Sequence, residues 1–542
     1  MDAVTVTPTP VNEPVLNYPP GSAERADVET ALKDLQSAPA ELTMTIDGHQ
    51  RFGGGDAFDV VQPHRHAAVL GTGRQATNAD VQAAVDAAVA AAPMWRELPF
   101  DERAAVLLRA ADLLAGPWRA RLVAATMLGQ SKTVFQAEID AACELIDFMR
   151  FNVHFGRQIL TEQPMSGAGV WNRMDHRPLE GFVLAISPFN FTAIAGNLPL
   201  APALMGNTVV WKPSPTQQFA AHCTMRLLEA AGLPPGVINM VTGDGHAVSE
   251  VAVGDPRLAG IHFTGSTTTF QHLWSTVGAR IASYRGYPRL VGETGGKDFV
   301  IAHPSAEPAA LVTALVRGAF EYQGQKCSAA SRAYIPRSLW DSEVRDALVH
   351  KTESLTYGDV TDLSQFGGAV IDRRSYDRLS KVQQMARSDA DVEVIAGGTG
   401  DDAEGFIVRP TVATSADPTH EIFTTEYFGP FLGVHVYEDS AYDETVAQAA
   451  DIAPYALTGS IFATDRRVID AAMQALRFSA GNFYVNDKPT GAVVGQQPFG
   501  GARASGTNDK AGSPLNLLRW TSPRIIKETF VPAVSVEYPH QG

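Results

Sequence analysis

The stretch GFVLAISPFNFTAIAGNLPLAPALMGNTVVWKP, residues 181–213, decides the fold class. From Gly181 to Trp211 it carries no charged residue, and it is longer than the roughly 20 apolar residues that span a bilayer. Three prolines and three asparagines inside it would interrupt helix hydrogen bonds or leave amides unpaired in lipid. The stretch therefore predicts a strand, a loop, a helix and a second strand, all buried in the core of a globular protein.

Strand and helix patterns continue to alternate after this stretch. Short apolar runs bounded by turn residues predict strands at residues 182–187, 207–213, 237–243, 260–266, 299–303, 331–336, 431–437, 459–464 and 482–487. Amphipathic runs between the first four strands predict helices. Alternation of this kind predicts right-handed crossovers and parallel sheets, so we expect an α/β fold in two lobes with ligands at the carboxyl ends of the strands.

The amino-terminal part is predicted to be mostly helical. The first 50 or so residues predict an arm on the surface, with a short acidic helix from Asp27 to Gln36. Asn78 and Asp101 are the expected N-caps of two amphipathic helices, and a third helix is expected from Gln136 to Phe155. The string Gly71-Thr-Gly-Arg-Gln-Ala76 imitates a dinucleotide fingerprint but lacks its acidic partner, so we interpret it as a turn.

Composition excludes several classes of partner. The 542 residues carry a formal net charge of −16 and no basic patch, so neither nucleic acid nor an anionic membrane is expected. Cys143, Cys223 and Cys327 have no close spacing, and the chain does not begin with a basic region followed by an apolar core. Both features favour a cytoplasmic protein in a reducing compartment. No metal is expected either, because the candidate histidines lack metal-ligand spacing: His64, His66 and His222.

Cys327 is a candidate nucleophile, 34 positions after the segment that begins at Glu293. A thiolate is a strong nucleophile where nearby cations favour the anion, and Lys326 and Arg332 are the candidate sources of that field. Glu293 begins a glycine-rich turn and is either a base beside the thiol or a helix cap. Composition alone favours the alternative of a buried, inert cysteine.

Two further segments indicate a dinucleotide site. The sequence FTGS at residues 263–266 closes a strand and opens a helix, where small residues let a phosphate approach free N–H groups. Lys212 lies one crossover earlier on the same predicted sheet edge, where its ammonium suits a ribose hydroxyl or a phosphate. Asn190 is a polar amide inside the charge-free stretch, and is either a structural hydrogen-bond hub or an oxyanion donor.

Six motifs, in order and spacing, resemble the aldehyde dehydrogenase superfamily, and the resemblance covers essentially the whole chain. They are SPFNF at 187–191, WKPS at 211–214, FTGS at 263–266, ETGGK at 293–297, GQKCS at 324–328 and EYFGP at 426–430. Residues 137–152, 187–207 and 486–510 are similar to one branch in particular. That branch oxidises L-glutamate γ-semialdehyde, the open form of Δ1-pyrroline-5-carboxylate, to L-glutamate in proline catabolism.

The resemblance implies an NAD-dependent enzyme with a covalent intermediate. It implies that Cys327 attacks the aldehyde carbon, that the Asn190 amide and the Cys327 N–H hold the oxyanion, and that Glu293 activates the water that hydrolyses the thioester. The implied cofactor contacts are Ser187, Pro188, Lys212, Ser214, Gly265, Ser266, Glu426 and Phe428. The implied substrate contacts are Ser328, Gly491, Ala492, Phe191, Phe499 and Glu144.

Two features of the sequence bear on specificity, one for the substrate and one for the cofactor. Ser328 and the turn at residues 490–492 resemble a clamp for the substrate α-carboxylate. Many NAD-preferring members carry an acidic residue three positions after the adenosine-site lysine, but this chain has Pro215 there. NAD remains the expected cofactor, and use of NADP is left open.

The resemblance also implies how the chain is divided. It predicts a Rossmann-like NAD-binding domain with an N-terminal arm at 1–160 and 180–293, and an α/β catalytic domain at 294–516. A small β oligomerisation hairpin and tail are expected at 161–179 and 517–542. A homo-oligomer, a dimer at least, is implied, and functional coupling to a separate proline dehydrogenase is left open.

Three alternatives are weighed against this interpretation. Another carboxylated aldehyde, such as succinate semialdehyde, would use the same chemistry. A coenzyme-A-acylating enzyme would pass the thioester to a thiol, which Glu293 as a base for water disfavours. A non-catalytic structural or binding descendant of the fold is disfavoured by the presence of Cys327, Glu293 and Asn190 together.

Replacing the nucleophile tests the assignment directly. We predict that Cys327→Ser abolishes NAD-linked oxidation and leaves the fold and dinucleotide binding intact, because a hydroxyl is a far weaker nucleophile than a thiolate. Turnover would be measured as NADH formation. A rate above about a hundredth of wild type would contradict a covalent role for this thiol.

Overall fold

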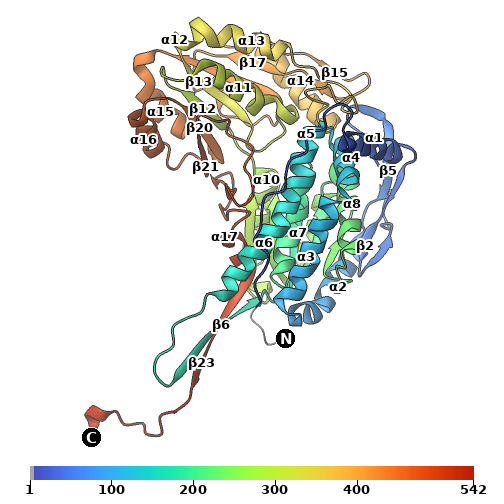
Figure 1. The fold of residues 1–542 in the computed structure, drawn as a ribbon, viewed down its shortest axis with the longest axis vertical. Helices are drawn as coiled ribbons and strands as arrows, with labels where there is room; N and C mark the ends of the chain where they lie inside the picture. The colour runs from blue at the N-terminus through green and yellow to red at the C-terminus, as the bar shows by residue number, and fades with distance from the viewer. Residues whose placement is uncertain (1–4) are drawn as a thin grey trace.

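The computed structural model describes residues 5–542; residues 1–4, the start of the expected N-terminal arm, lie outside them. Two α/β lobes and a projecting two-stranded hairpin make up the molecule (Figure 1). Each lobe is built around a seven-stranded sheet. The expected α/β fold class in two lobes is confirmed.

The first lobe holds a sheet of strand order β11-β10-β7-β8-β9-β2-β3. Its strands are β2 (Met44–Ile46), β3 (His49–Arg51), β7 (Phe182–Ser187), β8 (Thr208–Pro213), β9 (Ile238–Met240), β10 (Leu258–Thr264) and β11 (Arg289–Glu293). The strands from β11 to β9 are parallel to one another, as predicted. Strand β2 is antiparallel to its neighbours β9 and β3. Because parallel strands end at one edge, the segments after β7, β8, β10 and β11 meet there.

Side chains of β7 alternate between two faces that helices cover. Val183 and Ala185 pack into one core cluster, and Leu184 and Ile186 pack into another. Helices α3 (Phe100–Ala115), α4 (Arg119–Gln130), α6 (Leu145–Thr161), α7 (Thr192–Leu204) and α8 (Gln218–Ala230) contribute to the first cluster. Helices α2 (Asn78–Glu97), α9 (Gly245–Gly254) and α10 (Thr267–Ala279) contribute to the second. The charge-free stretch is therefore a buried strand and helix, as predicted.

Within residues 5–542, no helix is both long enough and apolar enough to cross a bilayer.

The second lobe holds a sheet of strand order β14-β17-β18-β13-β12-β20-β21. Its strands are β12 (Asp298–Ala302), β13 (Ala330–Pro336), β14 (Glu393–Ala396), β17 (Thr411–Thr414), β18 (Phe431–Tyr437), β20 (Thr458–Phe462) and β21 (Asn482–Val485). Helices α11 (Pro308–Phe320), α13 (Arg345–Glu353), α14 (Arg373–Ser388), α15 (Tyr442–Asp451) and α16 (Arg466–Ala475) pack against it. The five strands expected here are present. The sequence patterns did not predict β14 and β17, which have four residues each.

The first 50 residues are more than a surface arm, which corrects the expectation. Helix α1 (Ala23–Gln36) buries Val28 and Leu32, and all three residues of β2 are buried in the first sheet. Tyr18 is also buried, and its hydroxyl donates to Glu138 at 2.6 Å. These contacts depend on distant partners, so a short apolar pattern did not reveal them.

Two predicted N-caps are wrong, one by one residue and the other by two. Thr77 caps α2 instead of Asn78, because its hydroxyl accepts from the Asp80 N–H. Helix α3 begins after Pro99 instead of after Asp101.

The helix expected from Gln136 to Phe155 is not continuous. A π-helical segment, Glu138–Glu144, separates α5 (Val134–Ala137) from α6. Asp140 in this segment is buried and pairs with Lys132, and Asp140 and Glu293 are among the carboxylates near Glu144.

The glycine string at residues 71–76 is not a turn. Its first four residues end β5 (Arg65–Arg74), which lies between β1 (Ala40–Leu42) and β4 (Ala57–Gln62). Phe58 lies against Gly73, where an added Cβ would approach its ring to 2.6 Å. The glycines therefore permit close packing of strands, and the string plays no part in a nucleotide loop.

The hairpin pairs two segments that are distant in sequence. Strands β6 (Val170–Pro178) and β23 (Thr521–Thr529) are antiparallel along their whole length and project away from both lobes (Figure 1). Trp171 and Ile525 are about half exposed on it, at 48% and 57%. The predicted hairpin is therefore present, and its role in oligomerisation stays a prediction.

Candidate active site

Cys327 and Glu293 meet at the junction of the two lobes. Glu293 ends β11 at the edge of the first sheet, and Cys327 lies just before β13 of the second sheet. The thiol donates to Glu293 Oε1 at a Sγ–Oε1 distance of 3.5 Å. Cys327 is 8% exposed. The fold thus brings together the two groups that the sequence proposed as nucleophile and base.

Burial favours the protonated form of both groups. It raises the pKa of Glu293 to about 7, despite the opposing effects of the Cys327 hydrogen bond and of Lys510. Burial also raises the pKa of Cys327 well above its usual value, and Glu293 and Asp298 add to the effect. A thiol that faces carboxylates is held as the thiol until its proton is taken away.

Carboxylates, and not the two predicted cations, are the charged groups that shift the pKa of Cys327, which corrects the sequence interpretation. Lys326 pairs with Glu321 at 3.1 Å. Arg332 donates to the Lys297 carbonyl oxygen at 2.7 Å. Lys326 is therefore neutralised by a carboxylate, and Arg332 is bound to a carbonyl oxygen. Neighbours in sequence point in different directions in extended chain, so closeness to Cys327 in sequence does not bring a cation to its sulfur.

Asn190 follows β7 and faces the loop that carries Cys327. Its Nδ2 donates to the carbonyl oxygen of Gln325 at 3.0 Å, and its side chain is buried. An amide group has two N–H donors, so one remains beyond this bond. Asn190 is therefore a structural hub between the two loops, and it still has a donor for an oxyanion.

Ser328 and Thr490 also come together from distant segments. Their hydroxyls are 2.7 Å apart and both side chains are buried. Gly491, which follows, has a φ of +94°, a conformation that glycine adopts without strain. The turn at Gly491 and Ala492 therefore lies beside the residue next to Cys327, as the resemblance implied.

A small cavity adjoins Glu293. Glu144, Glu293 and Phe499 line one small cavity of about 50 Å³. Burial raises the pKa of Glu144 well above its usual value, with Asp140 as the next cause. Phe191 instead lies under the Lys132 ammonium, 4.2 Å from the ring centre. The structure joins Glu144 and Phe499 to the site, and places Phe191 against a buried cation.

The ends of β7 and β8 carry the first cofactor candidates. Ser187 and Pro213 are paired in register, and the Ser214 N–H donates to the Ser187 carbonyl oxygen at 3.1 Å, which places Pro188 on the same edge. Lys212 is buried, and burial lowers its pKa to about 8. An ammonium at this edge suits an anionic or hydroxyl-rich ligand.

The helix start after β10 is only partly as expected. Ser266 caps α10 by accepting from the Thr269 N–H at 3.2 Å. The Gly265 N–H donates to the Glu293 carbonyl oxygen at 3.2 Å, so it is not free for a phosphate. This bond corrects the expectation for Gly265 and ties the helix start to the strand end that carries Glu293.

Glu426 and Phe428 approach from the second lobe. Glu426 accepts from the Gly296 N–H at 2.9 Å, and a Cβ on Gly295 would lie 2.0 Å from its carboxylate. Phe428 adopts a φ of +53° and meets the Phe189 ring edge-on, with 5.7 Å between ring centres. Gly295 leaves space for the Glu426 carboxylate, and Phe428 lies against the segment that follows β7. This arrangement fits a dinucleotide that lies across the edge of the sheet.

One polar residue of this region escaped the sequence patterns. Lys297 Nζ is buried without a hydrogen-bond partner among residues 5–542, lies 4.8 Å from the Tyr427 ring centre, and has a pKa lowered to about 7 by burial. Glu426 is one of the carboxylates near it. The lysine was part of a recognised motif, but its burial beside Glu426 depends on both lobes.

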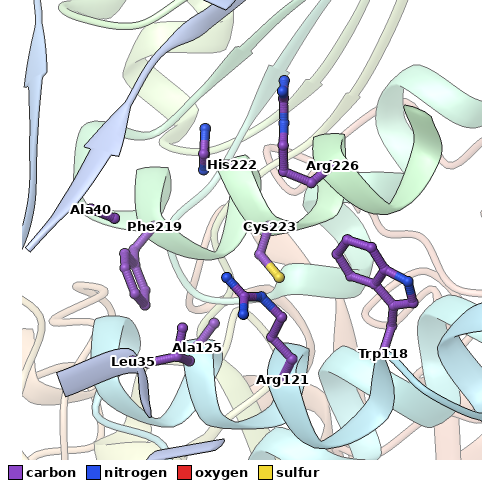
Figure 2. A pocket seen from close by; sticks show the side chains of 9 residues that line it. All are labelled: Leu35, Ala40, Trp118, Arg121, Ala125, Phe219, His222, Cys223 and Arg226. Atoms are coloured by element: carbon purple, nitrogen blue, oxygen red, sulfur yellow. The ribbon is translucent and has the colours of Figure 1, made fainter. Parts of the chain in front are cut away.

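The other cysteines lie outside this site. Cys223 lines a separate cavity of about 300 Å³ with Arg121, Trp118 and His222 (Figure 2). Burial raises its pKa to about 11 although Arg121 opposes the shift, so it stays a thiol. Cys143 is also buried with a raised pKa. Within residues 5–542, no group of three His, Cys, Asp or Glu side chains is arranged to hold a metal ion.

Known proteins resemble this chain over its whole length. Residues 52–526 match the aldehyde dehydrogenase family. The chain is 64% identical to the Δ-pyrroline-5-carboxylate dehydrogenase of Mycobacterium tuberculosis, solved with NAD bound; the match covers 100% of both chains with a TM-score of 0.97. The mitochondrial Δ1-pyrroline-5-carboxylate dehydrogenase of Homo sapiens is 46% identical, over 98% of this chain and 94% of that protein. Proline utilization A of Bdellovibrio bacteriovorus is 29% identical, over 99% of this chain and 55% of that one, with a TM-score of 0.89.

The protonation state of Cys327 is open to direct measurement. We predict that its alkylation by iodoacetamide without cofactor is slow at pH 7 and still accelerates above pH 9.0, its usual pKa, because the carboxylates around it favour the thiol. Glu293→Gln should accelerate alkylation at a fixed pH, since it removes one of those charges. Peptide mass spectrometry would follow each cysteine, and a rate that levels off below pH 8 would contradict the prediction.

Proposed function

The chain belongs to the aldehyde dehydrogenase family, and on that basis we propose that it oxidises L-glutamate γ-semialdehyde to L-glutamate with NAD, the second step of proline catabolism. The observation that carries the proposal is the Cys327 thiol 3.5 Å from the Glu293 carboxylate. The relative from Mycobacterium tuberculosis that is 64% identical is named for the cyclic form of this aldehyde. Together they assign both the chemistry and the substrate.

The first half of the reaction forms a covalent adduct. Cys327 loses its proton to Glu293 and its sulfur bonds to the aldehyde carbon, while the carbonyl electron pair moves to oxygen. The N–H of Asn190 that is left free by Gln325 holds this oxyanion, together with the Cys327 backbone N–H. A bound NAD would supply the acceptor for the hydride that leaves the adduct. A thioester then remains on Cys327.

The second half hydrolyses the thioester. Glu293 first passes the Cys327 proton to solvent. It then takes a proton from water, the hydroxide oxygen bonds to the thioester carbon, and the Cys327 sulfur leaves as a thiolate that regains the proton held by Glu293. A carboxyl group with a pKa of about 7 exchanges protons readily near neutral pH. One residue therefore serves as the base in both halves.

The cofactor contacts stay part of the proposal. Lys212 and Ser214 would hold the adenosine ribose, Ser266 would lie by the pyrophosphate, and Glu426 would hold the nicotinamide ribose, with Phe428 beside the ring. Support comes from their common edge, described above, and from the space at Gly295. Pro215 carries no negative charge against a 2′-phosphate, which leaves NADP open.

Substrate selection is assigned to the segment next to the nucleophile. Ser328 and Thr490 hydroxyls, with the N–H groups of the turn at Gly491 and Ala492, would hold the α-carboxylate. Phe499 would line the aliphatic chain. The clamp favours the five-carbon glutamate semialdehyde over the shorter succinate semialdehyde, which is the alternative within this chemistry.

Several broader assignments are proposals of the same kind. We assign residues 1–160 and 180–293 to an NAD-binding domain, 294–516 to a catalytic domain, and 161–179 with 517–542 to an oligomerisation hairpin and tail. The exposed apolar side chains of the hairpin support a dimer at least. A cytoplasmic location and coupling to a separate proline dehydrogenase stay predictions; the relative from Homo sapiens is mitochondrial.

A rate comparison tests the function as a whole. Purified protein would be assayed with glutamate semialdehyde and succinate semialdehyde, each with NAD and with NADP. We expect the highest kcat/KM for glutamate semialdehyde with NAD. A preference for succinate semialdehyde would overturn the substrate assignment, and absence of turnover with any aldehyde would overturn the enzymatic one.

Ser328→Ala tests the clamp. We expect a KM for glutamate semialdehyde raised by about 10- to 150-fold, because a hydrogen bond to a charged group contributes about 1.5–3 kcal/mol. Propanal, which has no carboxylate, is the control substrate and should be much less affected. Equal effects on both substrates would mean that the carboxylate is held elsewhere.

Glu293 predicts the acid limb of the pH profile. Since burial raises its pKa to about 7, Glu293 is protonated at pH 5 and cannot act as a base, so kcat should rise with pH and level off above about 7. Glu293→Gln should stop turnover after at most one NADH per active site. A pH profile that is unchanged in Glu293→Gln would contradict this role.

A further inference from the structure

A buried ion pair connects the two loops that carry Asn190 and Cys327. Lys132 and Asp140 are 1% exposed each, and their Nζ and Oδ2 atoms are 2.6 Å apart. Asp140 lies inside the π-helical segment Glu138–Glu144. Such π-turns are rare within helices and occur frequently at functional sites. Burying two charges costs several kcal/mol per ion. The mechanism described above gives this pair no role that would account for that cost.

Asp140 holds the start of α7. Its two carboxylate oxygens accept from the backbone N–H groups of Thr192 and Ala193, at 3.0 and 2.9 Å. Phe191, the N-cap position of this helix, supplies no side-chain cap of its own. Asp140, 52 positions before Thr192, therefore caps the helix, and the Phe191–Thr192 peptide that it fixes begins one residue after Asn190.

Lys132 holds the loop on the other side. Its ammonium lies between two aromatic rings, 4.2 Å from the centre of Phe191 and 4.4 Å from that of Tyr322. Buried cation–π contacts contribute about 2 kcal/mol when desolvated. Phe191 neighbours Asn190, and Tyr322 belongs to the segment that leads to Cys327, so one cation contacts both halves of the site.

The segment at Tyr322 requires such support. Tyr322, Gln323 and Gly324 have φ angles of +49°, +53° and +62°, which is a run of left-handed residues. Each non-glycine residue in this conformation costs about 1–2 kcal/mol. Gln323 offsets part of it by donating to the Ser131 and Ala369 carbonyl oxygens at 2.9 and 2.7 Å. The same stretch of chain, Ser131 and Lys132, therefore holds this turn from two sides.

We propose that Lys132 and Asp140 are a positioning pair, which sets the Asn190 amide relative to the Cys327 thiol through the start of α7 and the left-handed turn at Tyr322. Neither residue touches the reacting atoms, so neither is a catalytic residue. Their task is to keep the oxyanion donor and the nucleophile in register. The proposal rests on the proposed function, because it assumes that Asn190 stabilises an oxyanion.

The test removes both charges at once. A lone charge left in this site would be strongly destabilising, so the variant is Lys132→Met/Asp140→Asn. We expect kcat for glutamate semialdehyde to fall by about 10- to 100-fold, since a displacement near 1 Å has that effect. KM for the aldehyde and for NAD should stay within about threefold, because neither ligand contacts the pair. Lys132→Arg, which keeps the cation, should recover part of kcat.

A matched control separates positioning from stability. Glu138, on the same π-helical segment, forms another buried pair with Arg119 of α4, but Arg119 contacts Glu13 and Pro14 of the N-terminal segment instead. Arg119→Met/Glu138→Gln should lower Tm by a similar amount and leave kcat within about threefold of wild type. An equal loss of kcat in both double variants, or an unchanged kcat in Lys132→Met/Asp140→Asn, would overturn the proposal.

Two further measurements keep the test decisive. If Lys132→Met/Asp140→Asn does not fold, Tyr322→Leu takes its place, with Tyr322→Phe as the control that keeps the ring; kcat should fall only in Tyr322→Leu. Hydrolysis of p-nitrophenyl acetate needs the thiol and the oxyanion donor but no NAD. It should fall with kcat in the positioning variants. If wild type hydrolyses this ester but oxidises no glutamate semialdehyde, the proposed function fails, while the ester rates still decide the positioning role.

Discussion

A four-residue connection between the two sheets is the constraint on which the site depends. Residues 294–297 lead from the end of β11 in the first lobe to the start of β12 in the second. Gly295 and Gly296 make the path possible, since a Cβ would lie 2.0 Å from the Glu426 carboxylate at one and 2.5 Å from the Cys327 carbonyl oxygen at the other. Because β12 pairs with β13, the connection also determines where the loop carrying Cys327 lies.

Burial at this junction determines the electrostatics. Glu293, Asp298, Glu426 and Glu144 all have raised pKa values, with desolvation as the largest cause of each shift. The site therefore resists negative charge at rest. A thiol beside a base whose pKa is about 7 gives up its proton at neutral pH only when something stabilises the sulfur anion or the adduct. The Asn190 amide is placed to do so, and its bond to the Gln325 carbonyl oxygen holds it in position.

Prediction succeeded where one segment carried its own signal. The strands at 182–187, 208–213 and 431–437 read as apolar runs because helices cover both faces of their sheets. It failed where a distant partner decided the outcome. Residues 44–46 became a sheet strand through β9, the glycines at 71–74 served strand packing, and the Gly265 N–H was taken by Glu293. Lys326 and Arg332 look like an activating field in sequence, but their guanidinium and ammonium groups bind other partners in space.

The sequence by itself determined the family, the α/β fold class and the identity of the candidate nucleophile, base and oxyanion donor, because each belongs to a short motif with local meaning. Only the tertiary structure decided their separations, the protonation state of Cys327 and the pairing of Ser328 with Thr490. It also revealed that Lys132 and Asp140 join the loops of Asn190 and Cys327. The physical reason is that distances and desolvation are set by contacts between residues that are tens to hundreds of positions apart, and no local pattern encodes them.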